Sequence, residues 1–498
     1  MPNLLAPPQP SVHRAIGKCL AAISRSAPVP QAHRRELPFA VQELSRILTS
    51  ERAELRHSYW THTRLVSAYL YYFLPWNLYR LGWLIPQLDL GLEKHARILD
   101  LGCGPLTLPL ALWCARPDLR DTPLTFVCSD VSERPLSVGL KIFHTLTSQK
   151  DAEKAHPWQF TSLRAPLEIA LSKAANSAKE GYSLIMAGNV LNELTPLKSR
   201  TPEERVALCV DGAARLLKPG GRLFLVEPGT RLGSRSLHTA RNAALSAGMD
   251  ILAPCTHSGP CPMFAQKAYH AASPHFTGWC HFICPAKDAP QQLTALAAQA
   301  RLAKQSLALS CLLAQRPEAQ QTTTPTATGI DLAELEALYE EAMRDDNEDS
   351  TADERLPAYT DFPLAEASIT PFAIDHVKEP MFARVISDLI RLPDQPEPAR
   401  YACCPKGLAL LVDAVRVPSG AASLVRTHAP REAETPQRCT APTTEKKSAP
   451  RKEKFLGRAG KNTRVPAQDP ANAVRDAKTG ALMVELAGRA APILRKQR

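Results

Sequence analysis

Residues 96–107, with the sequence ARILDLGCGPLT, decide the fold of this chain. An apolar strand is expected at Ala96–Leu101, a glycine turn at Gly102–Gly104 and a helix from Thr107 to Arg116. A glycine turn between a strand and a helix lets the backbone approach a ligand closely. The pattern therefore predicts one unit of a nucleotide-binding sheet.

The residues that follow extend this sheet. The next expected strand, LTFVCSD, ends at Asp130, whose carboxylate could accept hydrogen bonds from both hydroxyls of a ribose. A further strand is expected at Tyr182–Ala187, with a loop and helix at 188–194, and another strand ends at Glu227. Alternation of short apolar strands with helical stretches is typical of a parallel sheet. We expect an α/β Rossmann-like domain over residues 91–248.

The ordered set DLGCG, SD, the fourth strand and LKPGGRL resembles the class I methyltransferases, which bind S-adenosylmethionine. The resemblance implies that Asp100, Gly102 and Gly104 serve the methionine side of this cofactor and that Asp130 serves the ribose. Asn189, in the loop after the fourth strand, is also expected at the cofactor.

Two departures leave catalysis open. Leu106 replaces the third glycine of the family motif, so we expect its side chain to crowd the cofactor or shift the loop. The loop Gly188–Leu191 lacks the Asp/Asn-Pro-Pro-aromatic sequence of amino-methylating enzymes, and Cys255 lies in the wrong place for a cytosine-C5 nucleophile. Asn192 and Glu193 are polar candidates, although helix capping and surface roles explain them equally well. Catalytic residues therefore remain unassigned.

A cluster of cysteines follows this domain. Cys255 and Cys261 are six residues apart, and Cys280 lies nineteen further on. The 13 cysteines form no regular disulfide framework, so reduced thiols and a metal site are favoured. Zinc and iron–sulfur clusters both accept thiolates. Further candidate ligands are His257, His281, Cys284, Cys403 and Cys404.

Composition divides the rest of the chain. We expect a disordered basic N-terminus over 1–36, a helical region over 37–90 and a Cys-rich segment over 249–290. Residues 291–430 should hold a helix at Gln291–Gln315, an acidic linker and a β region, and residues 431–498 a low-complexity tail. The apolar stretch Tyr59–Ile85 contains two Arg and a Pro, which predicts a buried helical region and no membrane span.

Charge is unevenly distributed. The net charge is +11, and residues 440–498 hold 14 Lys/Arg against 5 Asp/Glu, whereas residues 331–355 hold 11 acids against 2 Arg. A basic tail suits a polyanion such as RNA, and a solubilising tail is the alternative. The expected location is cytoplasmic; the mitochondrial matrix is the alternative, because no acid precedes Glu36. We expect no DNA partner. The sequence does not determine the oligomeric state.

Taken together, the motifs resemble one family, the mitochondrial-type small ribosomal subunit methyltransferase-like proteins, which also has bacterial relatives. The stretches that carry the resemblance are LSRILTSERAE (44–54), AYLYYFLPWN (68–77), DLGCGPLT (100–107), NVLNELTP (189–196), LVEPGTRLGSRSLHTARN (225–242), APCTHSGPCP (253–262), WCHF (279–282), RYACCPKGL (400–408) and RDAKTGALMVEL (475–486).

The resemblance implies a [4Fe–4S] cluster held by four cysteines and association with the small ribosomal subunit and its rRNA during assembly or translation. Its first three ligands would be Cys255, Cys261 and Cys280. Cys403 is preferred over Cys404 as the fourth, because Gly407 follows four residues later. Two alternatives stay open: an active rRNA methyltransferase, and a small-molecule methyltransferase with a structural zinc site.

Overall fold

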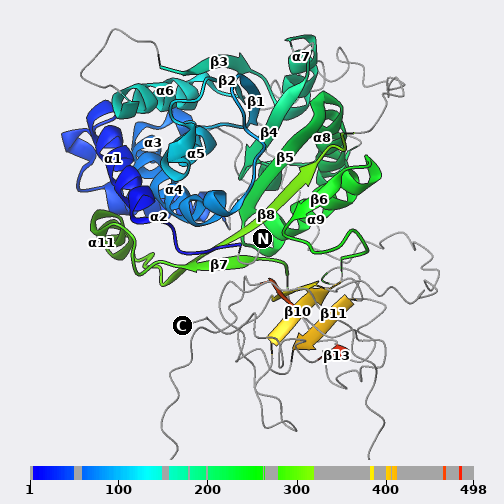
Figure 1. The fold of residues 1–498 in the computed structure, drawn as a ribbon. Helices are drawn as coiled ribbons and strands as arrows, with labels where there is room; N and C mark the ends of the chain where they lie inside the picture. The colour runs from blue at the N-terminus through cyan, green and yellow to red at the C-terminus, as the bar shows by residue number, and fades with distance from the viewer. Residues whose placement is uncertain are drawn as a thin grey trace, which may run out of the picture.

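The computed structural model describes residues 4–49, 59–147, 156–177, 180–197, 200–261, 263, 279–318, 382–385, 400–404, 407–411, 464–466 and 482–484. Within them the strands form two sheets, one of eight strands and one of five (Figure 1).

The larger sheet has the order β3-β2-β1-β4-β5-β8-β6, with β7 also paired to β8. Its strands are β1 (Ala96–Leu101), β2 (Leu124–Asp130), β3 (Trp158–Arg164), β4 (Tyr182–Gly188), β5 (Leu217–Pro228), β6 (Asp250–Ala253), β7 (Phe282–Pro285) and β8 (Ser306–Gln315). The first five are parallel to their neighbours, and β8 is antiparallel to β5. The strand order reverses between β1 and β4: the chain adds β2 and β3 on one side of β1 and then β4 and β5 on the other. Ligands of open α/β sheets bind at such a topological switch point. The expected class I Rossmann-like fold is confirmed.

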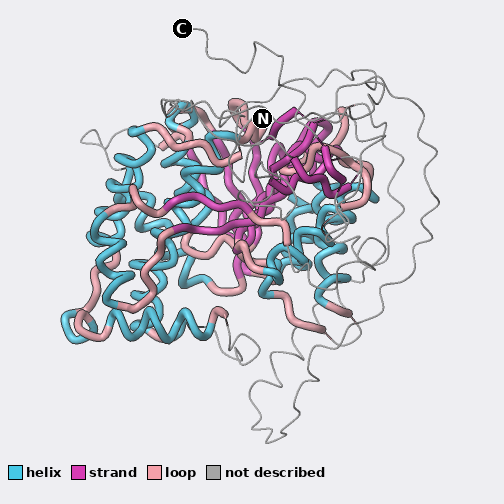
Figure 2. Tube along the Cα trace, turned by 90° about the horizontal axis from the view of Figure 1, so that it is seen from below, coloured by secondary structure: helices cyan, strands magenta, loops and turns pink. Residues whose placement is uncertain are grey.

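Helices cover both faces of this sheet (Figures 1 and 2). One face carries α1 (Pro10–Ser26), α2 (Leu37–Ile47), α3 (Thr63–Ala68), α4 (Leu74–Leu84), α5 (Thr107–Ala115), α6 (Glu133–Thr147) and α11 (Gln291–Gln299); the other carries α7 (Leu167–Ser177), α8 (Pro202–Leu216) and α9 (Arg231–Ser246). Successive strand residues alternate between the two cores: Ile98 packs on the first face and Leu99 on the second. Both faces of the central strands are therefore buried.

The N-terminal residues fold, so the expectation of disorder over 1–36 is wrong. Helix α1 begins with Pro10 at a position where proline is preorganised for a helix. Its buried residues Val12, Ile16, Cys19 and Ile23 follow helical spacing and join the core of the first face. The basic residues Arg14 and Lys18 lie on the exposed side of this helix, opposite its buried apolar residues.

The expected helix Gln291–Gln315 is also wrong in its second half. Helix α11 ends at Gln299, and residues 306–315, SLALSCLLAQ, form strand β8. A continuous apolar run suits either a buried helix or a central strand, and periodicity alone does not separate them. The sheet domain therefore extends beyond the expected boundary at residue 248.

The outer edge of the sheet is a split strand. Strands β6 and β7 both pair antiparallel with β8, β6 near Leu313 and β7 near Leu309. The chain leaves the sheet after Ala253 and returns at Phe282. The segment expected to be irregular, 249–285, is therefore an insertion between two strands of the sheet.

The smaller sheet has the order β12-β9-β10-β11-β13. Its strands are β9 (Phe382–Val385), β10 (Arg400–Cys404), β11 (Gly407–Leu411), β12 (Arg464–Pro466) and β13 (Leu482–Val484). The expected β region is present, and two strands from the expected low-complexity tail complete it, because RVP and LMV pair with its edges. The acidic stretch 331–355 lies outside the described residues. No helix in the described parts of the chain has the length and apolar character that crossing a membrane requires.

A buried ion pair ties α8 to α7. Arg205 Nε donates to Glu168 Oε1 at 2.7 Å, and both side chains are almost fully buried. We expect Arg205→Met to lower the free energy of unfolding by about 3–5 kcal/mol, because it leaves a buried carboxylate without its partner. The control Arg215→Met removes an exposed pair with Asp211 on the same helix and should cost less than about 1 kcal/mol. Urea unfolding followed by circular dichroism compares them; equal losses would contradict the prediction.

Candidate cofactor pocket and cysteine centre

The glycine loop after β1 contains two left-handed glycines with different roles. Gly102 has φ +63°, and a Cβ there would lie 2.6 Å from Val190 Cγ2, so the loop needs glycine to pack against the β4 loop. Gly104 has φ +52°, and a Cβ there would meet nothing closer than Thr107 Oγ1 at 3.9 Å and Tyr69 Oη at 4.0 Å. A Cβ on Gly104 would therefore make ordinary van der Waals contacts, whereas a Cβ on Gly102 would clash with Val190.

The side chain of Leu106 packs into the protein core, so the expectation that it crowds the cofactor is wrong. Its backbone keeps the left-handed conformation, with φ +58°, and its side chain is fully buried in the core. Leu106 Cγ lies 2.9 Å from the position that a Cβ would take on Gly139 of α6. The close approach that a third loop glycine would allow is here provided by Gly139 on the neighbouring helix.

Asp130 closes the loop from the end of β2. Its Oδ2 accepts a hydrogen bond from the Gly104 backbone N–H at 2.9 Å, and its Oδ1 accepts one from Ser132 N–H at 3.0 Å. Burial raises the pKa of this carboxyl, and these backbone donors lower it. Each oxygen keeps a further lone pair, so the group can still accept from a ligand hydroxyl.

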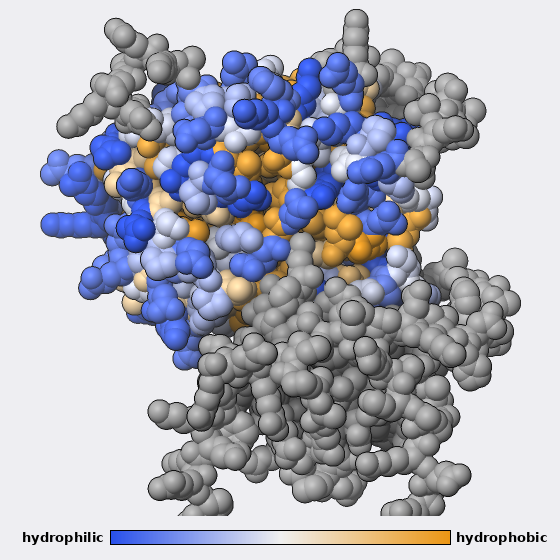
Figure 3. Space-filling model, in the orientation of Figure 1, coloured by the Kyte–Doolittle hydropathy of each residue, from blue (hydrophilic) through white to orange (hydrophobic). Residues whose placement is uncertain are grey.

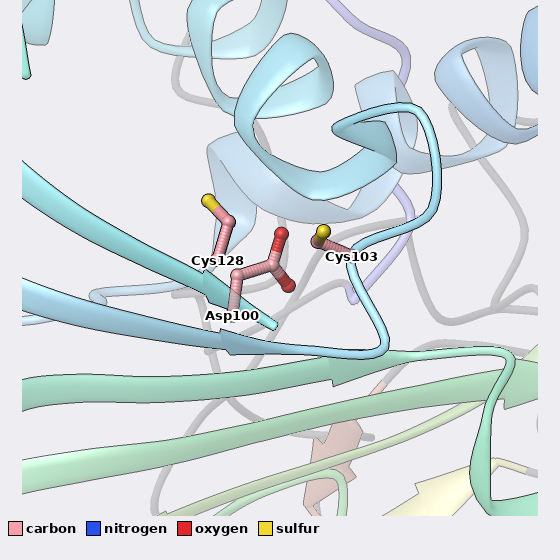
Figure 4. Close-up of side chains that lie close together, drawn as sticks. All are labelled: Asp100, Cys103 and Cys128. Carbon is pink, nitrogen blue, oxygen red and sulfur yellow. The ribbon is translucent and has the colours of Figure 1, made fainter. Parts of the chain in front are cut away.

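Asp100, at the end of β1, is a buried carboxylate without a hydrogen-bond partner on either oxygen. Burial, with a smaller contribution from Asp130, raises its pKa well above the usual range. Figure 4 shows it beside Cys103 and Cys128, and the ligand atoms of the three residues lie within 4.8 Å of one another. A hydrogen bond to Cys128 and burial raise the pKa of Cys103, which opposes the deprotonation that a metal ligand needs. These two thiols are therefore buried neighbours of Asp100 and are poorly suited to bind a metal.

The helical region reaches into the loop after β4. Arg80 of α4 is buried and donates to Asn189 Oδ1 and, at 3.2 Å, to the Ala308 carbonyl of β8. Asn189 itself has φ +61°. The side-chain oxygen of this expected cofactor contact is thus bound by the protein's own arginine.

Glu227 organises the same loop and was not identified from the sequence as a site residue. It is fully buried at the end of β5, and its Oε1 accepts from the backbone N–H groups of Val190 at 3.1 Å and Leu191 at 2.9 Å. Of the two polar candidates in this loop, Asn192 is buried and Glu193 is exposed. Glu193 lies near Tyr59 and Tyr69, whose pKa values burial raises first and this carboxylate raises further.

The cysteine centre lies where the edge strand is split. Cys255 follows β6 by two residues, and Cys280 precedes β7 by two. Burial raises the pKa of Cys403, and the neighbouring Cys255, Cys261 and Cys280 raise it further. The structure therefore brings the four expected ligands together from the insertion and from β10.

Strand geometry distinguishes the two adjacent cysteines of β10. Successive residues on a strand point to opposite faces, and Cys403 Sγ lies 3.3 Å from His257 Nε2. His257 is largely neutral, because burial and then Arg241 lower its pKa to about 4. His281 Nδ1 instead lies 2.9 Å from the Trp279 carbonyl, and Cys284 lies near Arg80.

Three further residues at the centre were missed from the sequence. Cys311 of β8 is buried close to Cys255, and burial raises its pKa to about 12. Arg241 and Arg384 approach the Cys255 segment from α9 and β9. Both arginines are nearly fully buried. Nothing in the local sequence separates these residues from other basic or apolar positions.

Comparison with known proteins gives one family match. Residues 94–312 match the family described as mitochondrial small ribosomal subunit Rsm22. No curated protein sequence matches the chain.

The solved structures that match the chain have low sequence identity and low TM-scores. A methyltransferase from Pyrococcus furiosus is 12% identical over 32% of this chain and 68% of its own, with a TM-score of 0.23. A putative sarcosine dimethylglycine methyltransferase from Galdieria sulphuraria is 14% identical over 52% and 89%, with a TM-score of 0.25. Fibrillarin from Aeropyrum pernix, crystallised with S-adenosyl-L-methionine, is 13% identical over 48% and 76%, with a TM-score of 0.26.

Gly139 gives a test of the loop geometry. A Cβ on this residue would lie 2.5 Å from the Pro105 carbonyl carbon and 2.7 Å from its oxygen, so Gly139→Ala must displace the glycine loop. We expect a loss of about 1–3 kcal/mol in the free energy of unfolding. The control Gly17→Ala, in an exposed part of α1 with nothing within 4 Å, should stabilise by about 0.5–1 kcal/mol. Thermal unfolding measures both, and stabilisation by Gly139→Ala would refute the loop argument.

Proposed function

We propose that this chain, whose residues 94–312 match the family described as mitochondrial small ribosomal subunit Rsm22, is a factor that binds the small ribosomal subunit and its rRNA. In this proposal the Rossmann-like domain binds S-adenosylmethionine, and Cys255, Cys261, Cys280 and Cys403 hold a [4Fe–4S] cluster. The observation that carries the proposal is the convergence of these four thiols at one edge of the sheet.

The spacing of the thiols supports a cluster over a single zinc ion. Tetrahedral zinc at about 2.3 Å from each sulfur needs sulfurs about 3.8 Å apart. Among the residues that the structure describes, the one group of three or more such ligand atoms within 4.8 Å is Asp100, Cys103 and Cys128. Every three of the four thiols therefore include a pair more than 4.8 Å apart, and a four-iron cube bridges such a distance more readily than one ion does.

A bound cluster would be redox-active and would link parts of the chain that are distant in sequence through its ligands. Cys255 and Cys261 lie in the insertion, Cys280 lies just before β7, and Cys403 lies in the smaller sheet. The contacts between these segments include a hydrogen bond from Arg384 Nε to the Pro254 carbonyl at 2.9 Å, and shared cluster ligands would add bonds to it. The cluster would therefore fix the smaller sheet against the Rossmann-like domain.

The polar groups at the glycine loop suit S-adenosylmethionine. The unpartnered Asp100 carboxylate suits the ammonium of the methionine part, and Asp130 keeps acceptor capacity for the ribose hydroxyls. Gly104 has φ +52°, a backbone conformation that favours glycine in the loop. The same features favour a second candidate, an active rRNA methyltransferase. Against it, Asn189 is bound by Arg80, so the loop that would hold an acceptor base is already engaged.

RNA contact would come from the basic part of the chain. Residues 440–498 carry a net charge of +9, from 14 basic and 5 acidic residues, which favours a polyanion through counterion release. We expect the purified protein to co-sediment with small subunits in a sucrose gradient at low salt and to dissociate as salt rises. Sedimentation away from small subunits at low salt would exclude the proposed function. Mapping of rRNA methyl groups in a deletion strain separates the two candidates, since only an active enzyme would leave a site unmethylated.

Adjacent cysteines provide a matched test of the cluster. We expect the anaerobically purified full chain to contain about four irons and four acid-labile sulfides, with broad visible absorption. Cys403→Ser should lose most of the iron, whereas Cys404→Ser should retain it, because Cys403 lies near the other three thiols. Iron, sulfide and zinc analysis measures this. Zinc without sulfide in the wild type, or equal iron loss in the two variants, would contradict the assignment.

A further inference from the structure

We propose that Arg241 is a positioning residue of the cysteine centre, where it hydrogen-bonds a ligand sulfur, fixes the ligand loop and offsets the negative charge of the metal–thiolate group. This inference rests on the proposed cluster, and it adds a residue outside the ligand set that controls the cluster's reduction potential and retention.

The contacts of Arg241 all reach one loop. From helix α9, Arg241 Nε donates to Cys255 Sγ at 3.3 Å. Its Nη2 donates to the carbonyl of His257 at 3.0 Å and to that of Gly259 at 2.7 Å. The guanidinium therefore holds the turn between Cys255 and Cys261, the two ligands closest in sequence.

The charge of Arg241 lacks a carboxylate partner within the described residues. The side chain is 3% exposed, and its Nη1 is buried without a hydrogen-bond acceptor. A buried cation is costly unless an opposite charge lies nearby. Four thiolates around an iron–sulfur cluster carry net negative charge, so loading of the centre would supply the missing counter-charge.

A second buried arginine, Arg384, approaches the cysteine centre from strand β9. Arg384 of β9 is also 3% exposed, and its Nε donates to the carbonyl of Pro254, directly before Cys255. Two cations from separate elements thus lie beside the Cys255 segment, where both would offset negative charge on a metal–thiolate group.

The planar, forked shape of the guanidinium allows Arg241 to make its three hydrogen bonds at the same time. A planar guanidinium can donate to one sulfur and two carbonyls at once, whereas a lysine ammonium is a point charge on a flexible stem. Groups that orient metal ligands in this way typically change metal affinity by about 10–100-fold when they are removed. Loss of the positive charge and of the sulfur hydrogen bond should also disfavour the more negative, reduced cluster.

Two variants of the full chain, purified anaerobically, separate these roles. Arg241→Gln removes the charge, and Arg241→Lys keeps the charge but removes the fork. The control Arg235→Gln removes an exposed arginine from the same helix. Spectroelectrochemical titration measures the reduction potential, transfer of iron to a chelator measures retention, and circular dichroism verifies folding.

We expect Arg241→Gln to lower the reduction potential and to release iron about tenfold faster or more than the wild type. Arg241→Lys should keep a potential near that of the wild type but release iron faster, and Arg235→Gln should match the wild type in both. A folded Arg241→Gln or Arg241→Lys protein with the potential and release rate of the wild type would overturn the inference. Wild-type protein without iron would instead overturn the proposed cluster itself, so the two failures are distinguishable.

Discussion

The antiparallel pairing of β8 with β5 on one side and with the split strand β6/β7 on the other is the constraint on which both sites depend. Glu227 of β5 lies opposite Ser310 of β8, and Ser310 Oγ donates to the Cys280 carbonyl at 2.8 Å. Arg80 binds the Ala308 carbonyl of the same strand. Strand β8 therefore contacts the helical region and the cysteine centre, and it pairs with β5, whose Glu227 holds the β4 loop.

A continuous set of contacts joins the cysteine centre to the cofactor side of the sheet. Trp279, next to Cys280, donates from Nε1 to the Gly229 carbonyl at 2.9 Å, and Arg231 lies over its ring at 5.3 Å. Gly229 follows the strand that carries Glu227, whose carboxylate holds the β4 loop. The Cys280 segment is therefore linked, through Trp279 and Gly229, to the end of β5 that carries Glu227.

Buried arginines connect the parts of this protein. Arg80, Arg205, Arg241 and Arg384 are each less than 9% exposed, and each donates to a backbone carbonyl on a distant segment. Arg205 also forms an ion pair with Glu168. Arginine suits this task because its five donors can satisfy several carbonyls at once. On the face of the molecule seen in Figure 3, hydrophilic residues surround a central apolar area.

The sequence by itself determined the parallel core. Strands Ala96–Leu101 and Leu124–Asp130 have the bounds expected from it, because apolar runs between glycine turns and helices are local signals. The positions of Asp100, Asp130 and the two loop glycines follow from the same signals. The clustering of cysteines in the sequence also indicated a thiol site, although not which of Cys403 and Cys404 faces it.

Tertiary structure decided the rest, because those features depend on contacts between distant residues. Residues 306–315 became a strand since β5 and β6 offer partners on both sides, and α1 folds since its apolar face completes the main core. Leu106 avoids the pocket only because Gly139 lies beside it. Pleating of β10 separates Cys403 from Cys404, and the approach of α9 places Arg241 against Cys255. No local pattern encodes such juxtapositions, which arise only when the two sheets and their helices pack.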